Sequence, residues 1–254
     1  MTYWQPSIYE RNQLLKYGLS EADFAKAQPM PVEYFTGRVT FAGVELHIDQ
    51  RALIPRVETE ELVGLVVEAG AAAPRPPQLL EIATGSGAIM TALLQQAQTG
   101  KWQLADWLAT DISPAALELA QLNLQPYVTA ENLSARLLQS DLLANVPQRQ
   151  FDLVVANLPY LPTATLTNLE ASVRDYEPLL ALDGGADGFT LIERLLRQLL
   201  EGDFLGASAQ VFLEVDASHD LDFLRQHYPW VLERWWVQAI TDQFGRQRFL
   251  RLVS

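Results

Sequence analysis

Short apolar segments alternate with longer amphipathic segments from residue 78 to the end of the chain. The longer segments, at residues 88–96, 114–124 and 188–200, have the length of helices. Repeated strand–helix units fold into a doubly wound, mostly parallel sheet. The sequence therefore predicts an α/β fold with a seven-stranded sheet, and its strands are expected at residues 79–82, 107–110, 135–138, 151–156, 210–215, 233–237 and 247–253.

The part of the chain before residue 78 has a different pattern. Proline and glycine interrupt residues 1–35, which indicates short helical pieces. Alternating apolar residues on both sides of Ala42-Gly43 are typical of a β-hairpin. A helix is expected at residues 58–69, and residues 71–77 are rich in alanine and proline, as in a linker. We therefore divide the chain into a short N-terminal helical segment (1–35), a hairpin with a connecting helix (36–77) and the main domain (78–254).

The charge balance argues against a nucleic-acid partner. The chain has 31 Asp and Glu residues against 18 Lys and Arg, for a formal net charge of −13. Proteins that bind nucleic acid gain much of their affinity by neutralising phosphates with Lys and Arg. Direct nucleic-acid binding is therefore not expected. The apolar stretches are too short to span a membrane, and the absence of cysteine fits a cytoplasmic protein.

A glycine-containing loop follows the first strand of the main domain. It spans Glu81, Ile82, Ala83, Thr84, Gly85, Ser86 and Gly87, and a helix is expected directly after it. Glycines permit a tight turn and a close approach of a ligand to the backbone, with a helix N-terminus behind them. A strand–helix turn that simply needs glycine would look the same, so this loop alone is a weak signal.

Two further strand ends strengthen the prediction of a cofactor site. Asp111 ends the second strand, where a carboxylate can accept hydrogen bonds from both hydroxyls of a ribose, although it could equally cap the next helix. Asp141 and Leu142 end the third strand, where a contact to an adenine ring would fall. The three positions together predict a nucleoside-containing cofactor. They do not distinguish a dinucleotide from S-adenosylmethionine.

The fourth strand, residues 151–156, runs directly into Asn157-Leu158-Pro159-Tyr160. Pro159 favours an extended conformation at Leu158, which can turn the Leu158 carbonyl outward. The Asn157 side-chain oxygen and that carbonyl could accept both N–H bonds of one NH2 group, while Tyr160 offers an aromatic face. A turn after a buried strand is the structural alternative. These four residues are our candidate catalytic residues, for methyl transfer to a planar amide or amine nitrogen.

The tetrapeptide resembles the Asn-Pro-Pro-Tyr motif of class I amino-methyltransferases, which have a Rossmann-like fold. Leu53-Ile-Pro-Arg-Val-Glu-Thr-Glu60 is similar to a block of the HemK/PrmC glutamine methyltransferases. The segments Pro31–Gly37, Glu177–Gly188 and Asp242–Arg248 also resemble parts of that family. The resemblance extends from about Pro31 to the C-terminus.

The resemblance implies an activity and a set of site residues. The HemK/PrmC family uses S-adenosyl-L-methionine to methylate the side-chain amide nitrogen of glutamine in the Gly-Gly-Gln motif of peptide-chain release factors. By this resemblance Asn157–Tyr160 would hold the glutamine amide, with Pro55 and Arg56 near the substrate entrance. The residues that would line the cofactor are Glu81, Ala83, Thr84, Gly85, Ser86, Gly87, Asp111, Asp141, Leu142 and Asn157.

The chain departs from the family pattern at several positions. Glu81 and Ala83 replace an aspartate and a glycine of the cofactor loop, and Leu158 replaces the first proline of the catalytic motif. The N-terminal helical segment is also shorter than the helical domain usual in the family. Two other functions therefore stay open: an adenine-N6 methyltransferase of RNA or DNA, and a methyltransferase-like binding protein without turnover. The three histidines are scattered and there is no cysteine, so we assign no metal site.

Overall fold

A seven-stranded sheet forms the centre of the computed structural model, which describes residues 5–129 and 136–254. The strand order is β5-β4-β3-β6-β7-β9-β8. Neighbouring strands are parallel except at β9, which is antiparallel to both β7 and β8. The predicted α/β class and mostly parallel seven-stranded sheet are thus confirmed. The strands are β3 (Gln78–Ile82), β4 (Asp106–Asp111), β5 (Leu137–Gln139), β6 (Phe151–Ala156), β7 (Leu205–Glu214), β8 (Trp236–Thr241) and β9 (Gln247–Val253).

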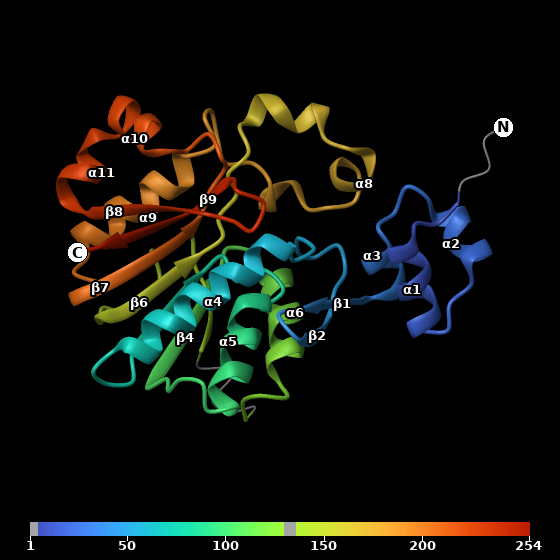
Figure 1. Ribbon diagram of the computed structural model, residues 1–254, viewed down its shortest axis with the longest axis horizontal. Coiled ribbons are helices and arrows are strands. Elements are labelled where there is room, and N and C mark those ends of the chain that lie inside the picture. The colour runs from blue at the N-terminus through green and yellow to red at the C-terminus, as the bar shows by residue number, and fades with distance from the viewer. Residues whose placement is uncertain (1–4, 130–135) are drawn as a thin grey trace.

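Helices cover both faces of this sheet because its central strands are apolar on both sides. Leu79 on β3 and Leu153 on β6 belong to the core shared with α4 (Val57–Ala72), α5 (Ala88–Gln98) and α6 (Pro114–Leu124). Their neighbours Leu80 and Val154 point to the opposite face and pack with α9 (Thr190–Glu201), α10 (Leu221–His227) and α11 (Pro229–Arg234). Figure 1 shows α4 and α5 in front of the sheet and α10 and α11 above it.

The connection between β6 and α9 is long and carries only short helices. These are the 3₁₀ helices η1 (Thr163–Asn168) and η2 (Leu179–Ala181) and the one-turn helix α8 (Ala171–Arg174). An isolated bridge between Leu161 and Asp183 closes the segment on itself. Because it begins at the end of β6, this connection lies next to the predicted catalytic tetrapeptide.

A small helical lobe precedes the main domain and lies at the opposite end of the molecule from the C-terminus (Figure 1). It consists of α1 (Ile8–Lys16), α2 (Glu21–Ala27) and α3 (Val32–Thr36), which bury Leu14, Phe24 and Val32 in a core of their own. A hairpin of β1 (Arg38–Phe41) and β2 (Val44–His47) follows. Ala42 and Gly43 both have positive φ, of 46° and 82°, as a two-residue hairpin turn requires.

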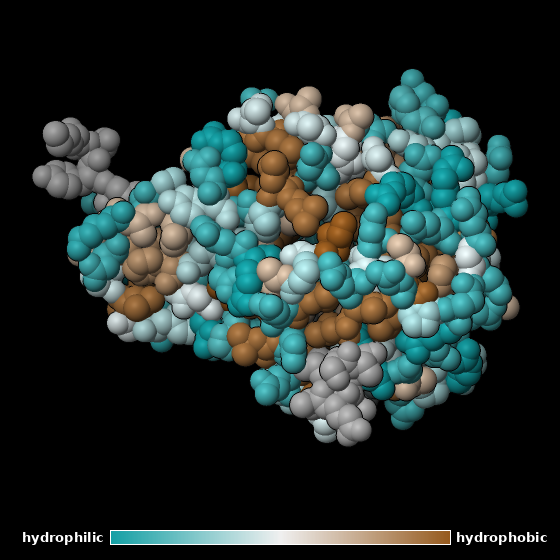
Figure 2. Space-filling view, turned by 180° about the vertical axis from the view of Figure 1, so that it is seen from behind, coloured by the Kyte–Doolittle hydropathy of each residue, from teal (hydrophilic) through white to brown (hydrophobic). Residues whose placement is uncertain are grey.

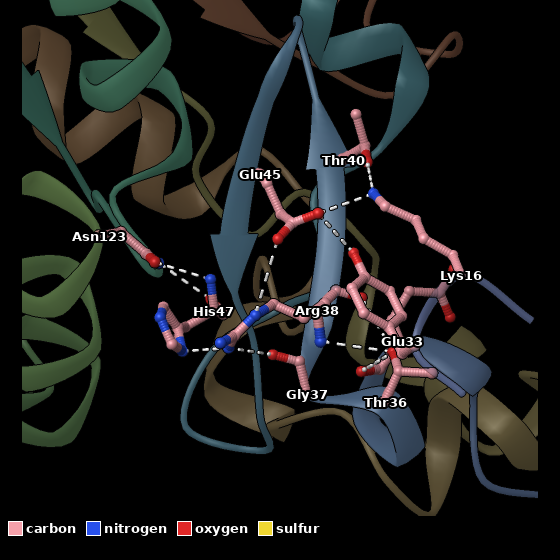
Figure 3. A network of polar contacts seen from close by, with 10 residues as sticks. Lys16, Glu33, Thr36, Gly37, Arg38, Thr40, Glu45, His47 and Asn123 are labelled. Atoms are coloured by element: carbon pink, nitrogen blue, oxygen red, sulfur yellow. Dashed lines mark hydrogen bonds and ion pairs between the residues drawn. The ribbon is translucent and has the colours of Figure 1, made fainter. Parts of the chain in front are cut away.

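Polar contacts connect the lobe to the hairpin and the hairpin to the main domain (Figure 3). On the lobe side, Glu45 pairs with Lys16 at 2.7 Å and accepts a hydrogen bond from the Tyr17 hydroxyl at 2.8 Å. On the other side, the buried Asn123 of α6 accepts from the His47 backbone N–H at 2.7 Å and donates to the His47 carbonyl at 2.9 Å. Asn123 also donates to the Ser86 carbonyl at 2.9 Å, so the hairpin is held against the glycine-containing loop.

The largest error of the sequence prediction is the strand expected at residues 233–237. Residues 229–234 form α11, and β8 begins only at Trp236. Pro229 starts this helix at its first turn, where the missing proline N–H costs no hydrogen bond. Strand β7 also begins at Leu205 rather than at residue 210. In the expected strand 135–138, residue 135 lies outside the described residues, as do residues 1–4 of the expected N-terminal segment.

On the face drawn in Figure 2, hydrophobic residues gather around the hollowed middle of the molecule, and hydrophilic residues surround them. Within residues 5–129 and 136–254, no helix is both long and apolar enough to span a bilayer.

Candidate active site

A cavity of about 240 Å³ lies at the carboxyl ends of β3, β4 and β6, where doubly wound sheets bind ligands. It combines loops that are far apart in the chain, including the segment before α4 and the end of the long β6–α9 connection. Most of the residues predicted from the sequence line this one cavity: Pro55, Ala83, Thr84, Gly85, Ser86, Asp111, Asp141, Leu142, Asn157, Leu158 and Pro159.

The glycine-containing loop takes a left-handed backbone conformation at three positions. Ala83, Gly85 and Gly87 have φ of 58°, 56° and 77°. Gly87 does not line the cavity, and a Cβ there would come within 3.1 Å of the Ala120 backbone, so its lack of a side chain serves helix packing. Ala83 lines the cavity, and its left-handed conformation disfavours a side chain. Alanine in place of the family's glycine is therefore strained at this position.

Glu81 is buried beneath this loop rather than exposed in the cavity. Its carboxylate accepts a hydrogen bond from the Thr84 hydroxyl at 2.8 Å, and only 1% of the residue is exposed. Burial, with nearby Asp111 adding to it, raises the pKa of Glu81 to about 8. Glu81 therefore supports the loop from below, and a neutral carboxyl is its favoured form at neutral pH.

Asp111 holds the loop and the start of α6 together at the edge of the cavity. Its Oδ2 accepts a hydrogen bond from the Gly85 N–H at 2.9 Å, and its Oδ1 accepts from the Ser113 N–H at 2.8 Å. The side chain that caps α6 is Ser113, which accepts from the Ala116 N–H, so Asp111 is not the helix cap. Because Asp111 lines the cavity, its carboxylate remains available to a ligand hydroxyl.

Asp141 and Leu142 form another part of the wall. Asp141 pairs with Arg194 of α9 at 2.8 Å, and both side chains line the cavity. Leu142 has a φ of 52°, another left-handed conformation at the cavity. Sequence reasoning missed Arg194, because nothing in a helical segment indicates which turn will reach a strand end more than fifty residues earlier.

Asn157 is held by a chain of hydrogen bonds that the sequence did not predict. Its Nδ2 donates to the Thr59 hydroxyl at 3.2 Å, and that hydroxyl donates to Glu214 Oε2 at 2.7 Å. Glu214 Oε1 accepts from the Tyr160 hydroxyl at 3.1 Å. Burial raises the pKa of Glu214, whereas the two hydroxyls and nearby Arg248 oppose that rise. Tyr160 thus contacts Glu214 through its hydroxyl, and its side chain is not part of the cavity lining.

Arg56 also lies outside the cavity. Its Nη2 donates to both carboxylate oxygens of Glu177 at 2.8 Å, and 1% of the Glu177 side chain is exposed. The pair joins the segment before α4 to the β6–α9 connection. Arg56 faces a neighbouring cavity of about 550 Å³ between the helical lobe and α8, which Glu33 and Glu170 also line. In the described part of the chain, no three His, Asp or Glu side chains are grouped to hold a metal ion.

A family model and a solved structure that resemble this chain are those of methyltransferases. The family model "Methyltransferase small domain" matches residues 66–172. The ribosomal protein L11 methylase of Lactobacillus delbrueckii has a similar fold, with a TM-score of 0.50 and 22% identity over 78% of this chain and 79% of that one.

Two curated relatives cover most of the chain. Release factor glutamine methyltransferase of Streptococcus pneumoniae is 33% identical over 87% of this chain and 74% of its own length. The human MTRF1L release factor glutamine methyltransferase is 34% identical over 98% of this chain and 73% of its own length. These names do not favour the adenine methyltransferase or the binding protein. The candidate site lies at the strand ends, and the similarity to these relatives extends over most of the chain. The chain therefore belongs to the release factor glutamine methyltransferase family.

Proposed function

We propose that this protein transfers a methyl group from S-adenosyl-L-methionine to the side-chain amide nitrogen of a glutamine, in the Gly-Gly-Gln motif of a peptide-chain release factor. The observation that carries the proposal is the position of Asn157, Leu158 and Pro159 in the wall of the cavity that the glycine-containing loop and Asp111 also line. A methyl donor and an NH2 group bound in that cavity would be neighbours. The names of the family relatives support glutamine as the acceptor.

The residues of the cavity suit this cofactor. Asp111 is 8% exposed and lines the cavity, so it can accept both ribose hydroxyls there. Ile112 and Leu142 offer apolar side chains for an adenine ring, with Asp141 beside them as an acceptor for an amino group. Ala83–Ser86 would contact the amino-acid part of the cofactor, with Glu81 and Gly87 supporting the loop from outside the cavity. When bound, S-adenosyl-L-methionine supplies an electrophilic methyl group on a sulfonium.

The remaining work of the site is to bind and align the glutamine amide. An amide nitrogen is a weak nucleophile because its lone pair is delocalised. The Asn157 side-chain oxygen and the Leu158 carbonyl would accept its two N–H bonds and turn the nitrogen towards the methyl group. Alignment of this kind can lower a barrier by roughly 7–11 kcal/mol. No side-chain base is required, since the proton can leave after the methyl group has arrived.

The protein substrate would reach the cavity past Pro55, which lines it, and past the Arg56–Glu177 pair at the border of the second cavity. We retain the division into residues 1–35, 36–77 and 78–254, with the helical lobe and hairpin beside this entrance. The cytoplasm stays the expected compartment.

Tritiated S-adenosyl-L-methionine, offered with a release factor, a Gly-Gly-Gln peptide and RNA in separate reactions, tests this function. We expect label in the release factor, and none when its motif glutamine is replaced by glutamate. Label in RNA, or no label in any acceptor despite measurable binding of S-adenosylhomocysteine, would contradict the proposal.

A further inference from the structure

We propose that Glu214, acting through Thr59, determines which end of the Asn157 side-chain amide faces the substrate. Glu214 would thus be a positioning residue that makes the site selective for an NH2 group. This inference rests on the proposed function, because it assigns Asn157 to the binding of the substrate amide.

The hydrogen bonds that link Asn157, Thr59 and Glu214 all run in one direction, from Asn157 to Thr59 and from Thr59 to Glu214. Glu214 Oε2 accepts the one hydrogen of the Thr59 hydroxyl, at 2.7 Å. Towards Asn157 the hydroxyl is left as an acceptor, and it takes an N–H from Nδ2 at 3.2 Å. The Asn157 amide has its NH2 at that end and its oxygen at the other. The oxygen is therefore the end available to a ligand in the cavity that Asn157 lines.

Thr59 alone could not impose this direction. A hydroxyl rotates and can donate to either neighbour, so with a donor in place of Glu214 it would give its hydrogen to the Asn157 oxygen instead. Glu214 is suited to the task because its other oxygen, Oε1, is occupied by the Tyr160 hydroxyl at 3.1 Å. Burial raises the pKa of Glu214, and the hydrogen bonds from Thr59 and Tyr160 and the nearby Arg248 guanidinium oppose that rise.

Thr59 and Glu214 are buried, so water does not replace either of them in this series of hydrogen bonds. Thr59 is 3% exposed and Glu214 is 1% exposed. They come from different elements, the first turn of α4 and the last residue of β7, and meet behind the end of β6. Packing therefore fixes the chain of hydrogen bonds before any substrate arrives.

A selectivity follows for the substrate side chain. With its oxygen towards the ligand, Asn157 can accept from a glutamine NH2 but cannot donate to a glutamate carboxylate. Reversal of the amide would present NH2 to the ligand and would favour glutamate. The ratio of the dissociation constants for glutamate and glutamine forms of one substrate therefore reports the direction of the Asn157 amide.

Three variants test this with a release-factor fragment in its Gly-Gly-Gln and Gly-Gly-Glu forms. Glu214→Gln keeps the shape of the side chain and adds a donor, Thr59→Val removes the hydroxyl, and Thr59→Ser is the matched control that retains it. We expect the wild type to prefer the glutamine form by about 10- to 100-fold, the scale for one hydrogen bond to a charged or buried group. Thr59→Val should bring that ratio close to one and lower kcat/KM for glutamine by roughly 100-fold, whereas Thr59→Ser should keep most of both. Glu214→Gln should lower both by less, because its amide can present either its oxygen or its NH2 to Thr59.

Binding of S-adenosylhomocysteine and the melting temperature, measured on the same variants, separate positioning from a loss of folding. If Glu214→Gln unfolds, Thr59→Val against Thr59→Ser still decides the question. A glutamine preference that is unchanged in folded Thr59→Val would overturn the inference while the proposed function stands. A wild type that binds the fragment yet never methylates its glutamine would instead overturn the proposed function.

Discussion

At the scale of single residues, the proposed function gives Asn157 and Asp111 separable roles. Asn157 is proposed to hold the acceptor, so Asn157→Ala should abolish methyl transfer while leaving the affinity for S-adenosylhomocysteine nearly unchanged. Radiolabel transfer and calorimetry on the same preparation measure both properties. A variant as active as the wild type would contradict the role of Asn157.

Asp111 lines the cavity and is proposed to bind the cofactor, so its removal should affect binding directly. We expect Asp111→Ala to weaken cofactor binding by roughly 1–3 kcal/mol, because the Gly85 N–H and the ribose hydroxyls both lose an acceptor. Isothermal titration with S-adenosylhomocysteine gives the dissociation constant. An unchanged constant would remove Asp111 from the site.

Glu81 should make the stability of the cofactor-free protein depend on pH. Its pKa is about 8 when folded and about 4.5 when unfolded, so between these values the folded state binds the extra proton. Stability is therefore lost as the pH rises from about 4.5 to about 8. Glu81→Gln, which can still accept from Thr84, should stabilise the protein by up to about 4 kcal/mol at pH 8 and by nothing near pH 4. Urea unfolding across this range is the measurement, and a constant difference between the two proteins would argue against the raised pKa.

At the scale of elements, the Arg56–Glu177 pair joins the segment before α4 to the β6–α9 connection. Arg56→Met should destabilise the protein by about 3 kcal/mol, because it leaves the buried Glu177 carboxylate without its cation. Replacing both residues, as Arg56→Met with Glu177→Gln, should recover much of that loss. Denaturant midpoints measure the effect, and a double variant no more stable than Arg56→Met would show that the pairing is not the cause.

The strands and helices also differ in how well the sequence predicted them. The strands of the parallel sheet were predicted because their two-sided burial leaves nearly continuous apolar runs, as at residues 151–156. The strand expected at residues 233–237 was wrong because Trp235 and Trp236 favour a strand locally, whereas Pro229 starts a helix that runs to Arg234. Such a boundary depends on the partner that each tryptophan contacts: Trp235 is buried, and Trp236 is 60% exposed.

At the scale of the whole molecule, stability should be uneven. The helical lobe buries three apolar residues in its own core, whereas the sheet is packed on both faces by extensive cores. Segments with few buried contacts open at lower free energy. Hydrogen exchange followed by mass spectrometry should show fast exchange in α1–α3 and the slowest in β3, β6 and β7. Equal protection of the lobe and the central strands would contradict this expectation.

The sequence by itself determined the fold class, and it singled out the glycine-containing loop, Asp111 and the Asn157–Tyr160 tetrapeptide as candidate site residues, because strand–helix periodicity and the residues at strand ends are local properties of the chain. Only the tertiary structure decided that Arg56 pairs with Glu177 outside the cavity, that Asp141 meets Arg194, and that Thr59 and Glu214 lie behind Asn157. These partners are separated by 53 to 155 residues. Their contacts depend on how helices and loops pack against the sheet, a relation between distant segments that no local pattern records.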